Sequence, residues 1–415
     1  MPGAGKLSAG GHAVIIGGGP GGTACALALQ SLAGEMGRKI DITIVEGKHF
    51  ISEQHYNQCI GVLSPPLPTL LETSLDVPFP HYLSKRTIKR YILHTEKESI
   101  IIDDEDVPSL ALRRIQYDTY MLETVKERGI EVLPARAVDL EFHADRVVIY
   151  TENVPLEADV VVGAFGLDEG SASMLARHSP YRPPRALNSI VTKVHPHPEE
   201  MEDFIMGIHA FLPPQPGIEF GGITPKGSHL AINIAGRHVD TDLMRQFLHL
   251  PMVREVLPLK DSPNQYHPED FRFFKGRFPT SLAKGFYGDR YVTVGDAAGL
   301  VRAFKGKGVT SAVKSGIRAA QTILTVGITK QAFHDHYRAE NQDIIRDLPY
   351  GQGIRLLTIT LARFHLLDPV LRAAQTNAEL RRALFEAVSA HAPYQQVVHR
   401  SLRPRTLVSV LRNLL

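Results

Sequence analysis

The clearest pattern of apolar and polar positions lies near the start of the chain. Residues 13–16 are an unbroken apolar run, a glycine-rich segment follows at 17–22, and residues 24–29 are small or apolar. Residues 40–45 then alternate largely between apolar and polar side chains. A short apolar run bounded by glycine is typical of a buried parallel strand, and a following run of small residues is typical of a closely packed helix. The pattern predicts a strand–turn–helix–strand unit, preceded by a flexible leader over the first 12 residues.

The turn of this unit carries the spacing G-x-G-x-x-G. The first glycine permits a tight turn, the second lets a pyrophosphate approach the backbone, and the third lets the helix lie close to the strand. Free N–H groups at the helix start attract phosphate, and an acid at the end of the second strand can bind an adenosine ribose. The alternative is a glycine-rich turn in an unrelated fold. The residues expected to contact a dinucleotide here are Gly17, Gly19, Pro20, Gly21, Gly22 and Glu46.

Weaker patterns fill the region between residues 50 and 185. The stretch 50–80 is rich in proline, serine and glycine and predicts an irregular loop, a kind of segment that is usually functional. The runs 88–94 and 99–103 alternate and predict a hairpin. The other elements expected here are a helix opened by Arg114, a parallel strand at 129–133, a hairpin of 138–142 with 147–151, and a buried strand at 158–166.

From residue 186 the pattern changes to short runs separated by turn residues, which predicts a second lobe of antiparallel strands. Two helical pieces follow it. The strands are expected at 189–195, 204–211, 218–223 and 229–234, and the helical pieces near 240–248 and 252–257.

A second strong signal lies much later in the chain. The apolar run 291–294 leads directly into Gly295 and Asp296, and Gly308 then precedes an amphipathic helix at 310–324. A glycine-flanked helix start again offers free N–H groups to a ligand. The remainder, 332–415, is expected to be almost wholly helical, with breaks at prolines.

Composition narrows the class of protein. A chain of 415 residues is too long for one ordinary core, so two or three lobes are expected. The net charge of +2 is not the footprint of a nucleic-acid-binding protein. The chain has neither the apolar core of a signal peptide at its start nor a run of about 18 apolar residues. We therefore expect a globular, cytoplasmic protein.

The chemistry of cysteine and histidine adds two further expectations. Only Cys25 and Cys59 are present, which indicates a reducing compartment and no disulfide framework. The His-x-His pairs at 195–197 and 334–336 have no evident third or fourth ligand, so no metal site is expected.

Three separated features now occur in one order: the glycine-rich turn at 17–22, the helix that starts at Arg114, and Gly295-Asp296 before a glycine-flanked helix. This order resembles the flavoproteins of the para-hydroxybenzoate hydroxylase fold, and within them it is most similar to the geranylgeranyl reductase family. The resemblance covers roughly residues 12 to 350. Its closest matches are 295–299, 306–308 and 315–316, and residues 58–61 are similar to the family's cysteine-glycine stretch beside the flavin.

The resemblance implies an α/β fold with a Rossmann-like FAD-binding domain, an antiparallel-sheet substrate domain and a helical C-terminal region. The FAD-binding domain is expected to be discontinuous. Its expected parts are 1–80, 110–185 and 281–345; the substrate domain takes 81–109 and 186–280, and the C-terminal region takes 346–415.

The resemblance also implies roles at the ring end of FAD. Gly295 and Asp296 would contact the flavin, and the carboxylate would accept a hydrogen bond from the ribityl chain. The N–H groups of Lys307, Gly308 and Val309 would face the pyrimidine end of the isoalloxazine, where a partial positive charge stabilises the anionic reduced ring.

At the other end of FAD, the resemblance implies that Arg114 holds the pyrophosphate or ribityl region, with the adjacent Arg113 as an alternative. Ala137 and Val138 would offer backbone contacts to the adenine. Cys59 has two interpretations. Its thiol could donate a proton after hydride transfer, or it could shape the pocket as a small apolar residue.

Two segments depart from the family patterns. Many hydroxylases of this fold have Asp-Gly where this chain has Phe165-Gly166, an acid that helps to arrange FAD and the nicotinamide donor. The reductases have a Tyr-x-Trp-x-Phe-Pro-like strand at the substrate wall, and the corresponding 220–226 keeps only a phenylalanine and a proline. The substrate pocket is therefore expected to have a different shape.

The first functional hypothesis is an FAD-dependent oxidoreductase that reduces a C=C bond of an isoprenoid or similar apolar small molecule, with NAD(P)H as a candidate electron donor. The second hypothesis is a flavin-dependent monooxygenase or halogenase on the same fold. The third is an FAD-binding redox or partner-binding module without turnover.

The last segment, 402–415, predicts a basic amphipathic helix. Such a helix either lies on a membrane surface or packs on its own core. The chain is therefore a candidate for peripheral membrane association. The stripe is formed by Leu407, Val410, Leu411 and Leu414, with Arg403, Arg405 and Arg412 near it.

Overall fold

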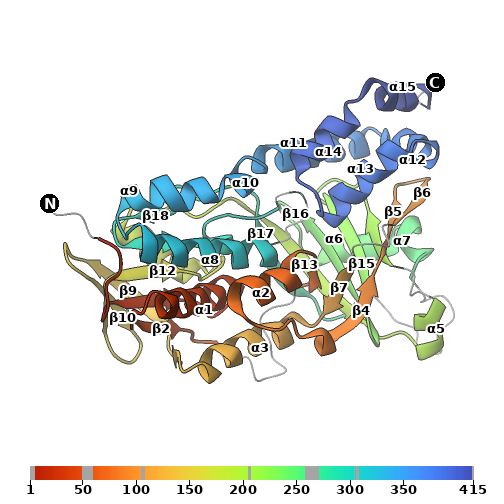
Figure 1. The fold of residues 1–415 in the computed structure, drawn as a ribbon. Helices are drawn as coiled ribbons and strands as arrows, with labels where there is room; N and C mark the ends of the chain where they lie inside the picture. Colours follow the sequence, from red (N-terminus) through yellow and green to blue (C-terminus); the bar gives the residue numbers. More distant parts are fainter. Residues whose placement is uncertain are drawn as a thin grey trace.

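The computed structural model describes residues 5–48, 59–103, 108–203, 207–257, 271–302, 304 and 308–413. Two large sheets form its framework, and Figure 1 shows them next to each other with α1 and α8 over the first and the C-terminal helices over the end of the second. This is the α/β fold that the sequence predicts, with parallel and antiparallel sheets and a helical C-terminal region.

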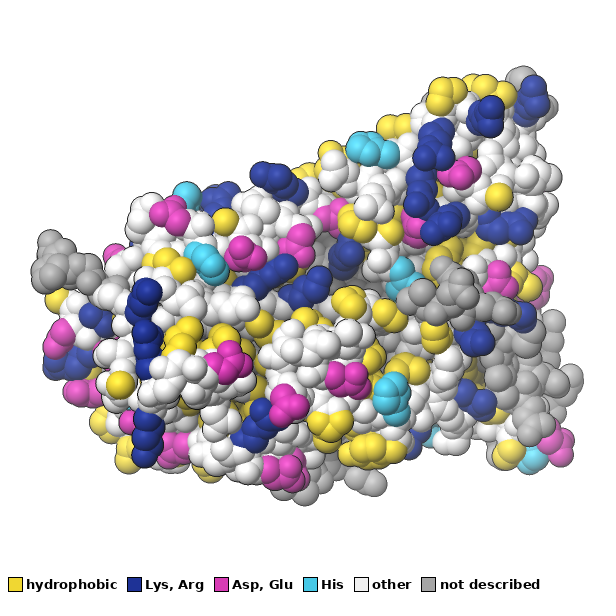
Figure 2. Space-filling model, viewed as in Figure 1, with side chains coloured by type: hydrophobic (Ala, Val, Ile, Leu, Met, Phe, Trp, Pro, Cys, Tyr) yellow, Lys and Arg dark blue, Asp and Glu magenta, His cyan; other side chains and the backbone are white. Residues whose placement is uncertain are grey.

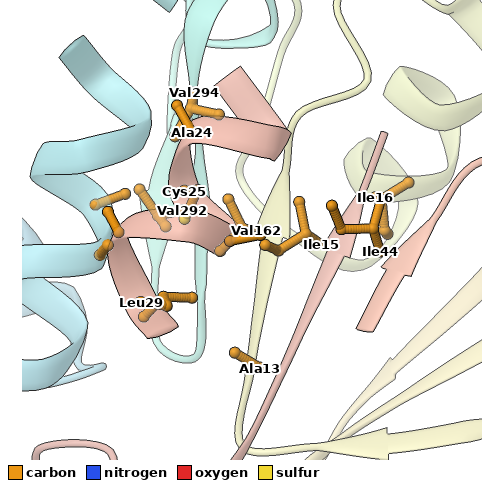
Figure 3. Close-up of a cluster of buried hydrophobic side chains, with 14 of the residues drawn as sticks. Ala13, Ile15, Ile16, Ala24, Cys25, Leu29, Ile44, Val162, Val292 and Val294 are labelled. Carbon is orange, nitrogen blue, oxygen red and sulfur yellow. The ribbon is translucent and has the colours of Figure 1, made fainter. Parts of the chain in front are cut away.

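The first sheet is parallel apart from one short edge strand, and its order is β18-β19-β12-β1-β2-β8. The predicted strand–helix–strand unit at its centre is confirmed, because β1 pairs in parallel with β2 across helix α1. Apolar side chains of the central strands meet α1 in a dry core, which Figure 3 shows. The strands are β1 (His12–Ile16), β2 (Asp41–Val45), β8 (Glu131–Leu133), β12 (Val160–Gly163), β18 (Tyr287–Gly288) and β19 (Tyr291–Thr293).

Helices α1 (Pro20–Glu35) and α8 (Val309–Thr325) lie side by side over this sheet (Figure 1). A Cβ at Gly316 would lie 2.3 Å from the carbonyl oxygen of Gly21, so only glycine permits this separation. Ser315, one residue earlier, accepts a hydrogen bond of 2.9 Å from the backbone N–H of Gly295. The two predicted glycine-rich segments are therefore joined through α8.

The second sheet has the order β17-β13-β16-β15-β14-β5-β6. It is antiparallel except near one edge, where β14 pairs in parallel with β5, the neighbour of edge strand β6. The expectation of a purely antiparallel lobe is wrong at this pair, because no short turn joins the two strands and dictates their direction. The strands are β5 (Arg90–His94), β6 (Ser99–Asp103), β13 (Ala186–Val194), β14 (Ile208–Phe211), β15 (Phe220–Lys226), β16 (His229–Gly236) and β17 (Phe274–Pro279).

Pro225 lies within β15, although proline cannot donate a hydrogen bond to a ladder. Pro225 pairs with β16 on one side of β15. On the other side, the pairing of β15 with β14 ends at Ile223, so β14 requires no hydrogen bond from Pro225. This explains why an inner strand of the sheet tolerates a proline.

The described residues also form two smaller sheets. Their orders are β11-β10-β9 and β3-β7-β4, and the predicted hairpins of β9 with β10 and of β5 with β6 are confirmed. Their strands are β3 (Val62–Leu63), β4 (Ser84–Ile88), β7 (Ser109–Leu112), β9 (Ala137–Phe142), β10 (Val147–Thr151) and β11 (Leu156–Ala158).

Two expectations for irregular segments are wrong within the described residues. The first 12 residues are not all a free leader, because Leu7 is buried and its N–H donates to the carbonyl of Ile323 at 3.1 Å. The stretch 50–80 contains helix α2 (Leu67–Leu75), which begins among prolines and buries Leu67, Leu71 and Leu75 on one face. Proline is compatible with the first turn of a helix, so the proline-rich composition was misleading there.

The remaining helices before α8 occur between strands in the order of the chain. Helix α3 opens at Arg114, as predicted. The helices are α3 (Arg114–Glu127), α4 (Glu169–His178), α5 (Pro198–Asp203), α6 (Thr241–His249) and α7 (Pro251–Arg254).

The C-terminal part is helical, as predicted, and its later helices extend from the body at the upper right of Figure 1. None of the helices in the described ranges combines the length and the apolar character needed to cross a bilayer. The helices are α9 (Lys330–Ala332), α10 (Gln342–Ile345), α11 (Leu348–Arg363), α12 (Leu367–Thr376), α13 (Ala378–Ser389), α14 (Tyr394–Ser401) and α15 (Pro404–Arg412).

The apolar stripe predicted for the last segment is divided in α15. Val410 packs against a buried cluster, whereas Leu411 is exposed. Dark-blue basic side chains gather over the C-terminal helices in Figure 2. The peripheral membrane contact stays a prediction.

A half-buried histidine pair in the second sheet makes stability depend on pH. His94 Nε2 lies 2.9 Å from His209 Nδ1, and burial lowers their pKa values to about 4 and about 3. The unfolded chain therefore binds protons first as the pH falls below about 6.5, and the free energy of unfolding falls with it.

We expect the double substitution His94→Phe with His209→Phe to flatten the pH dependence of the free energy of unfolding between about pH 6.5 and pH 4. Urea denaturation at several pH values measures this slope. The exposed His334→Phe is the matched control and should keep the wild-type slope. An unchanged slope in the double variant would contradict the assignment.

Candidate functional site

Several residues singled out by the sequence analysis follow the carboxyl ends of strands in the first sheet. Gly17 comes directly after β1, Glu46 after β2, Phe165 shortly after β12, and Gly295 shortly after β19. In open α/β sheets, ligands bind at this edge, where the loops after neighbouring strands converge.

A cavity of about 1620 Å³ opens at this edge and continues to the second sheet. Its volume exceeds the roughly 300–1,000 Å³ of an ordinary small-molecule pocket. Most of the expected site residues line it, while Gly22 does not and instead packs against the carbonyl of Gly17. Lys307 lies outside the described residues. The expected residues that line the cavity are Gly17, Gly19, Pro20, Gly21, Glu46, Cys59, Arg114, Ala137, Val138, Gly295, Asp296, Gly308 and Val309.

The start of α1 is shaped for close approach by a ligand. Gly17 has φ of +110°, and a Cβ there would lie 2.5 Å from the carbonyl oxygen of Ala164. A Cβ at Gly19, by contrast, would meet no described atom within 4 Å. The carboxylate of Glu46 accepts hydrogen bonds of 2.8 Å from the N–H groups of Gly18 and Lys48, which fix it beside the glycine turn.

The helices α1 and α8 both begin without a side-chain cap and without an acid in the first turn. Their N-caps are Gly19 and Gly308. Several other helices, such as α2 and α3, also lack a side-chain cap, whereas α4, α6 and α13 are capped by Asp or Asn side chains. Two sets of first-turn N–H groups are thus left for a ligand, since the first four N–H groups of a helix have no partner within it. Negative or electron-rich groups bind favourably there.

Asp296 lies next to the start of α8. A Cβ at Gly308 would be 2.8 Å from Asp296 Oδ1, so glycine leaves room for the carboxylate. Burial raises the pKa of Asp296, and the nearby Arg114 opposes the rise. The interaction also shows that folding brings Asp296 and Arg114 to the same part of the cavity.

Arg114 is oriented by an acid that the sequence analysis did not assign. Its Nε donates to Asp118 Oδ1 at 2.7 Å, and the side chains of Arg114 and Asp118 are only 13% and 3% exposed. Burial alone would lower the pKa of Arg114, but the ion pair outweighs it and the pKa rises. The i,i+4 spacing on α3 was the available signal for this pair.

The alternative, Arg113, does not line the cavity. It lies with Lys193 and Lys226 near one end of the second sheet, where Lys226 Nζ donates to the carbonyl of Cys59 at 3.3 Å. Burial lowers the pKa of Lys226 to about 8, and Lys193 and Arg113 add to the fall. Cys59 is therefore a cavity residue close to two cations, Arg114 and Lys226.

Phe165, which replaces the acid of many hydroxylases, also lines the cavity and packs edge-to-face against Tyr181 at 6.0 Å. Asp168 is the next acid along the chain, but its carboxylate caps α4 by accepting from the N–H and Oγ of Ser171. Asp168 also lines the cavity, with its carboxylate held in this cap.

The cavity has lining residues that the sequence analysis missed. Ser64, Tyr91 and His391 come from three distant segments, and no spacing in the sequence relates them. Among the residues that the structure describes, no group of three or more side chains is arranged to hold a metal ion.

The residues present fit a dinucleotide cofactor. The cavity has two uncapped helix starts, a fixed carboxylate beside the first, and a largely buried arginine near Asp296. Pyrophosphate requires donors and positive charge, and an extended cofactor requires them at more than one place.

Comparison with known proteins gives structural but not sequence matches. No protein-family model and no curated protein matches the chain. A flavoprotein/dehydrogenase from Cytophaga hutchinsonii is 16% identical with a TM-score of 0.71, and covers 97% of this chain and 99% of its own. A geranylgeranyl bacteriochlorophyll reductase-like protein from Thermoplasma acidophilum is 16% identical with a TM-score of 0.67, and covers 95% and 99%.

A p-nitrophenol 4-monooxygenase from Pseudomonas putida is 15% identical with a TM-score of 0.66, and covers 93% of this chain and 99% of its own. The chain therefore has the fold of FAD-dependent oxidoreductases of the para-hydroxybenzoate hydroxylase type. Proteins similar to it in structure include reductases, monooxygenases and halogenases.

We expect Asp118→Ala to lower the free energy of unfolding by about 3 kcal/mol, because it leaves the buried Arg114 without its carboxylate. The control is Asp242→Ala, which breaks an exposed pair with Arg245 and should cost less than about 1 kcal/mol. Urea denaturation measures both. If both variants lowered the free energy of unfolding equally, burial of the Arg114–Asp118 pair would add nothing to its contribution to stability.

Proposed function

We propose that the protein binds FAD and, with the reduced cofactor, reduces a carbon–carbon double bond of an isoprenoid or similarly apolar substrate. The observation that carries this proposal is the single cavity that joins two uncapped helix starts to the inner face of the second sheet. The start of α1 with Glu46 suits the adenosine and pyrophosphate, and the start of α8 with Asp296 suits the flavin end.

The composition of the cavity wall supports an apolar substrate. The second sheet and neighbouring segments contribute many apolar residues to the wall, beside polar ones such as Asn188, Thr224 and Asn233. The apolar lining residues include Ile190, Val191, Ile208, Ala210, Phe220, Val239 and Phe278.

Reduced FAD would supply a hydride to the substrate. The chain's own groups would bind and orient: first-turn N–H groups of α8 stabilise negative charge at the flavin, and Arg114, held by Asp118, offers a fixed positive charge. Cys59 is the candidate proton donor from the sequence, and its position in the cavity wall is compatible with that role. NAD(P)H as the electron donor stays a prediction.

Anaerobic reoxidation tests the reaction. We expect the chemically reduced protein to recover its oxidised-flavin absorbance when a prenyl substrate is added, and not when the fully saturated analogue is added. Failure with every prenyl compound, together with hydroxylation or halogenation of an added aromatic compound in the presence of oxygen, would replace the reductase by the monooxygenase or halogenase alternative.

Gly19→Val tests the position of the cofactor. Because a Cβ at Gly19 would meet no described atom within 4 Å, we expect the unfolding midpoint of the FAD-free protein to stay unchanged. The added side chain would project where the pyrophosphate approaches, so we expect FAD affinity to fall at least about tenfold. Fluorescence titration with FAD measures it. Gly34→Val in the same helix, which also meets no atom within 4 Å, should bind FAD like the wild type.

A further inference from the structure

A cluster of polar side chains lies in the cavity wall, and its members are far in sequence from the glycine-rich cofactor motifs. Ser64 follows β3, Tyr91 lies in β5, and His391 follows α13. These three side chains line the cavity, and Ser109 at the start of β7 connects two of them. Four segments of the chain thus bring hydroxyl and imidazole groups together within a largely apolar part of the wall.

The group is joined by hydrogen bonds through Ser109, which is fully buried. Ser109 Oγ lies 2.9 Å from Ser64 Oγ and 3.2 Å from His391 Nε2. Helix α13 ends at Ser389, and the next residue, Ala390, has φ of 53°, which turns the chain and leads directly to His391. The C-terminal helical region therefore supplies one wall of this part of the cavity.

Tyr91 provides the second observation. Its side chain is only 3% exposed, and its hydroxyl lies beside Ser109, but no described residue meets the geometry of a hydrogen bond with it. Burial raises the pKa of Tyr91 to about 12, so the hydroxyl stays protonated and can donate. Its ring is held edge-to-face against Phe385 at 5.8 Å. A buried hydroxyl without a partner costs free energy unless a ligand satisfies it.

We propose that Tyr91, together with the Ser64–Ser109–His391 chain, binds a neutral hydroxyl or carbonyl oxygen of the substrate. The proposal rests on the proposed function in one respect, since it describes the same cavity, and it adds that the substrate is not a pure hydrocarbon. The oxygen fits a site that offers a phenolic donor and hydroxyl groups able to donate or accept. A charged group would have to be desolvated beside the apolar wall with no described countercharge on these four side chains, which disfavours it.

Matched probe molecules test the site in the protein as purified with its cofactor. p-Cresol and p-xylene have nearly the same shape and differ in one hydroxyl; 4-methylcyclohexanone and 1,4-dimethylcyclohexane form a second pair that offers only an acceptor. We expect the wild type to bind the oxygen-containing member of at least one pair about 3- to 10-fold more tightly, the worth of one net hydrogen bond. Ligand-observed NMR titration measures the dissociation constants.

The variant Tyr91→Phe keeps the ring and removes the hydroxyl. We expect it to lose the preference for oxygen, to bind the hydrocarbons as before, and to unfold at a nearly unchanged midpoint, because the contact of the hydroxyl with Ser109 does not reach the geometry of a hydrogen bond. Tyr82→Phe, at a ring that is 74% exposed, is the control and should keep the preference.

Two outcomes would overturn the proposal: no preference for oxygen in the wild type, or a preference that survives in Tyr91→Phe. Both are distinct from failure of the proposed reaction. A protein that reoxidises with prenyl compounds but shows no preference for oxygen remains a reductase without this subsite.

Discussion

The close contact between α1 and α8 is the constraint on which the rest of the site depends. Gly21 and Gly316 let the two backbones approach to a distance that any side chain would prevent. Each helix starts with a glycine at the carboxyl edge of the first sheet. Because the helices pack side by side, their uncapped N-termini open into one cavity, and the two ends of an extended cofactor can be held by one rigid unit.

Electrostatics follows from this arrangement. Two helix starts concentrate partial positive charge, and the acids that lie near them are held by specific partners. Glu46 is fixed by backbone N–H groups, and Asp296 lies within reach of the charge of Arg114. Arg114 is in turn held by Asp118, so a cation is kept beside the cavity although burial alone opposes it. The charges are thereby positioned before any ligand arrives, which lowers the cost of binding.

The second sheet and the C-terminal helices form the part of the cavity wall that lies away from the cofactor motifs. The sheet contributes many apolar residues to the wall, and the parallel pairing of β14 with β5 brings Tyr91 to the cavity with Ile208 and Ala210. Helix α13 packs against this end of the sheet, and His391 follows it into the same wall. The fold is shared with reductases, monooxygenases and halogenases, so the chemistry depends on these lining side chains and not on the fold itself.

The sequence by itself determined the features that depend on local backbone geometry and on periodic burial. These include the unit β1–α1–β2, the glycine-started helix α8, the helix that opens at Arg114 and the helical C-terminal region, because glycine spacing and apolar periodicity act within a few residues. Tertiary structure alone decided that Arg114 and not Arg113 lines the cavity, and that Leu7 packs on the core. It also joined Ser109 to His391 across 282 positions, a contact that no local pattern encodes because it depends on how whole elements pack.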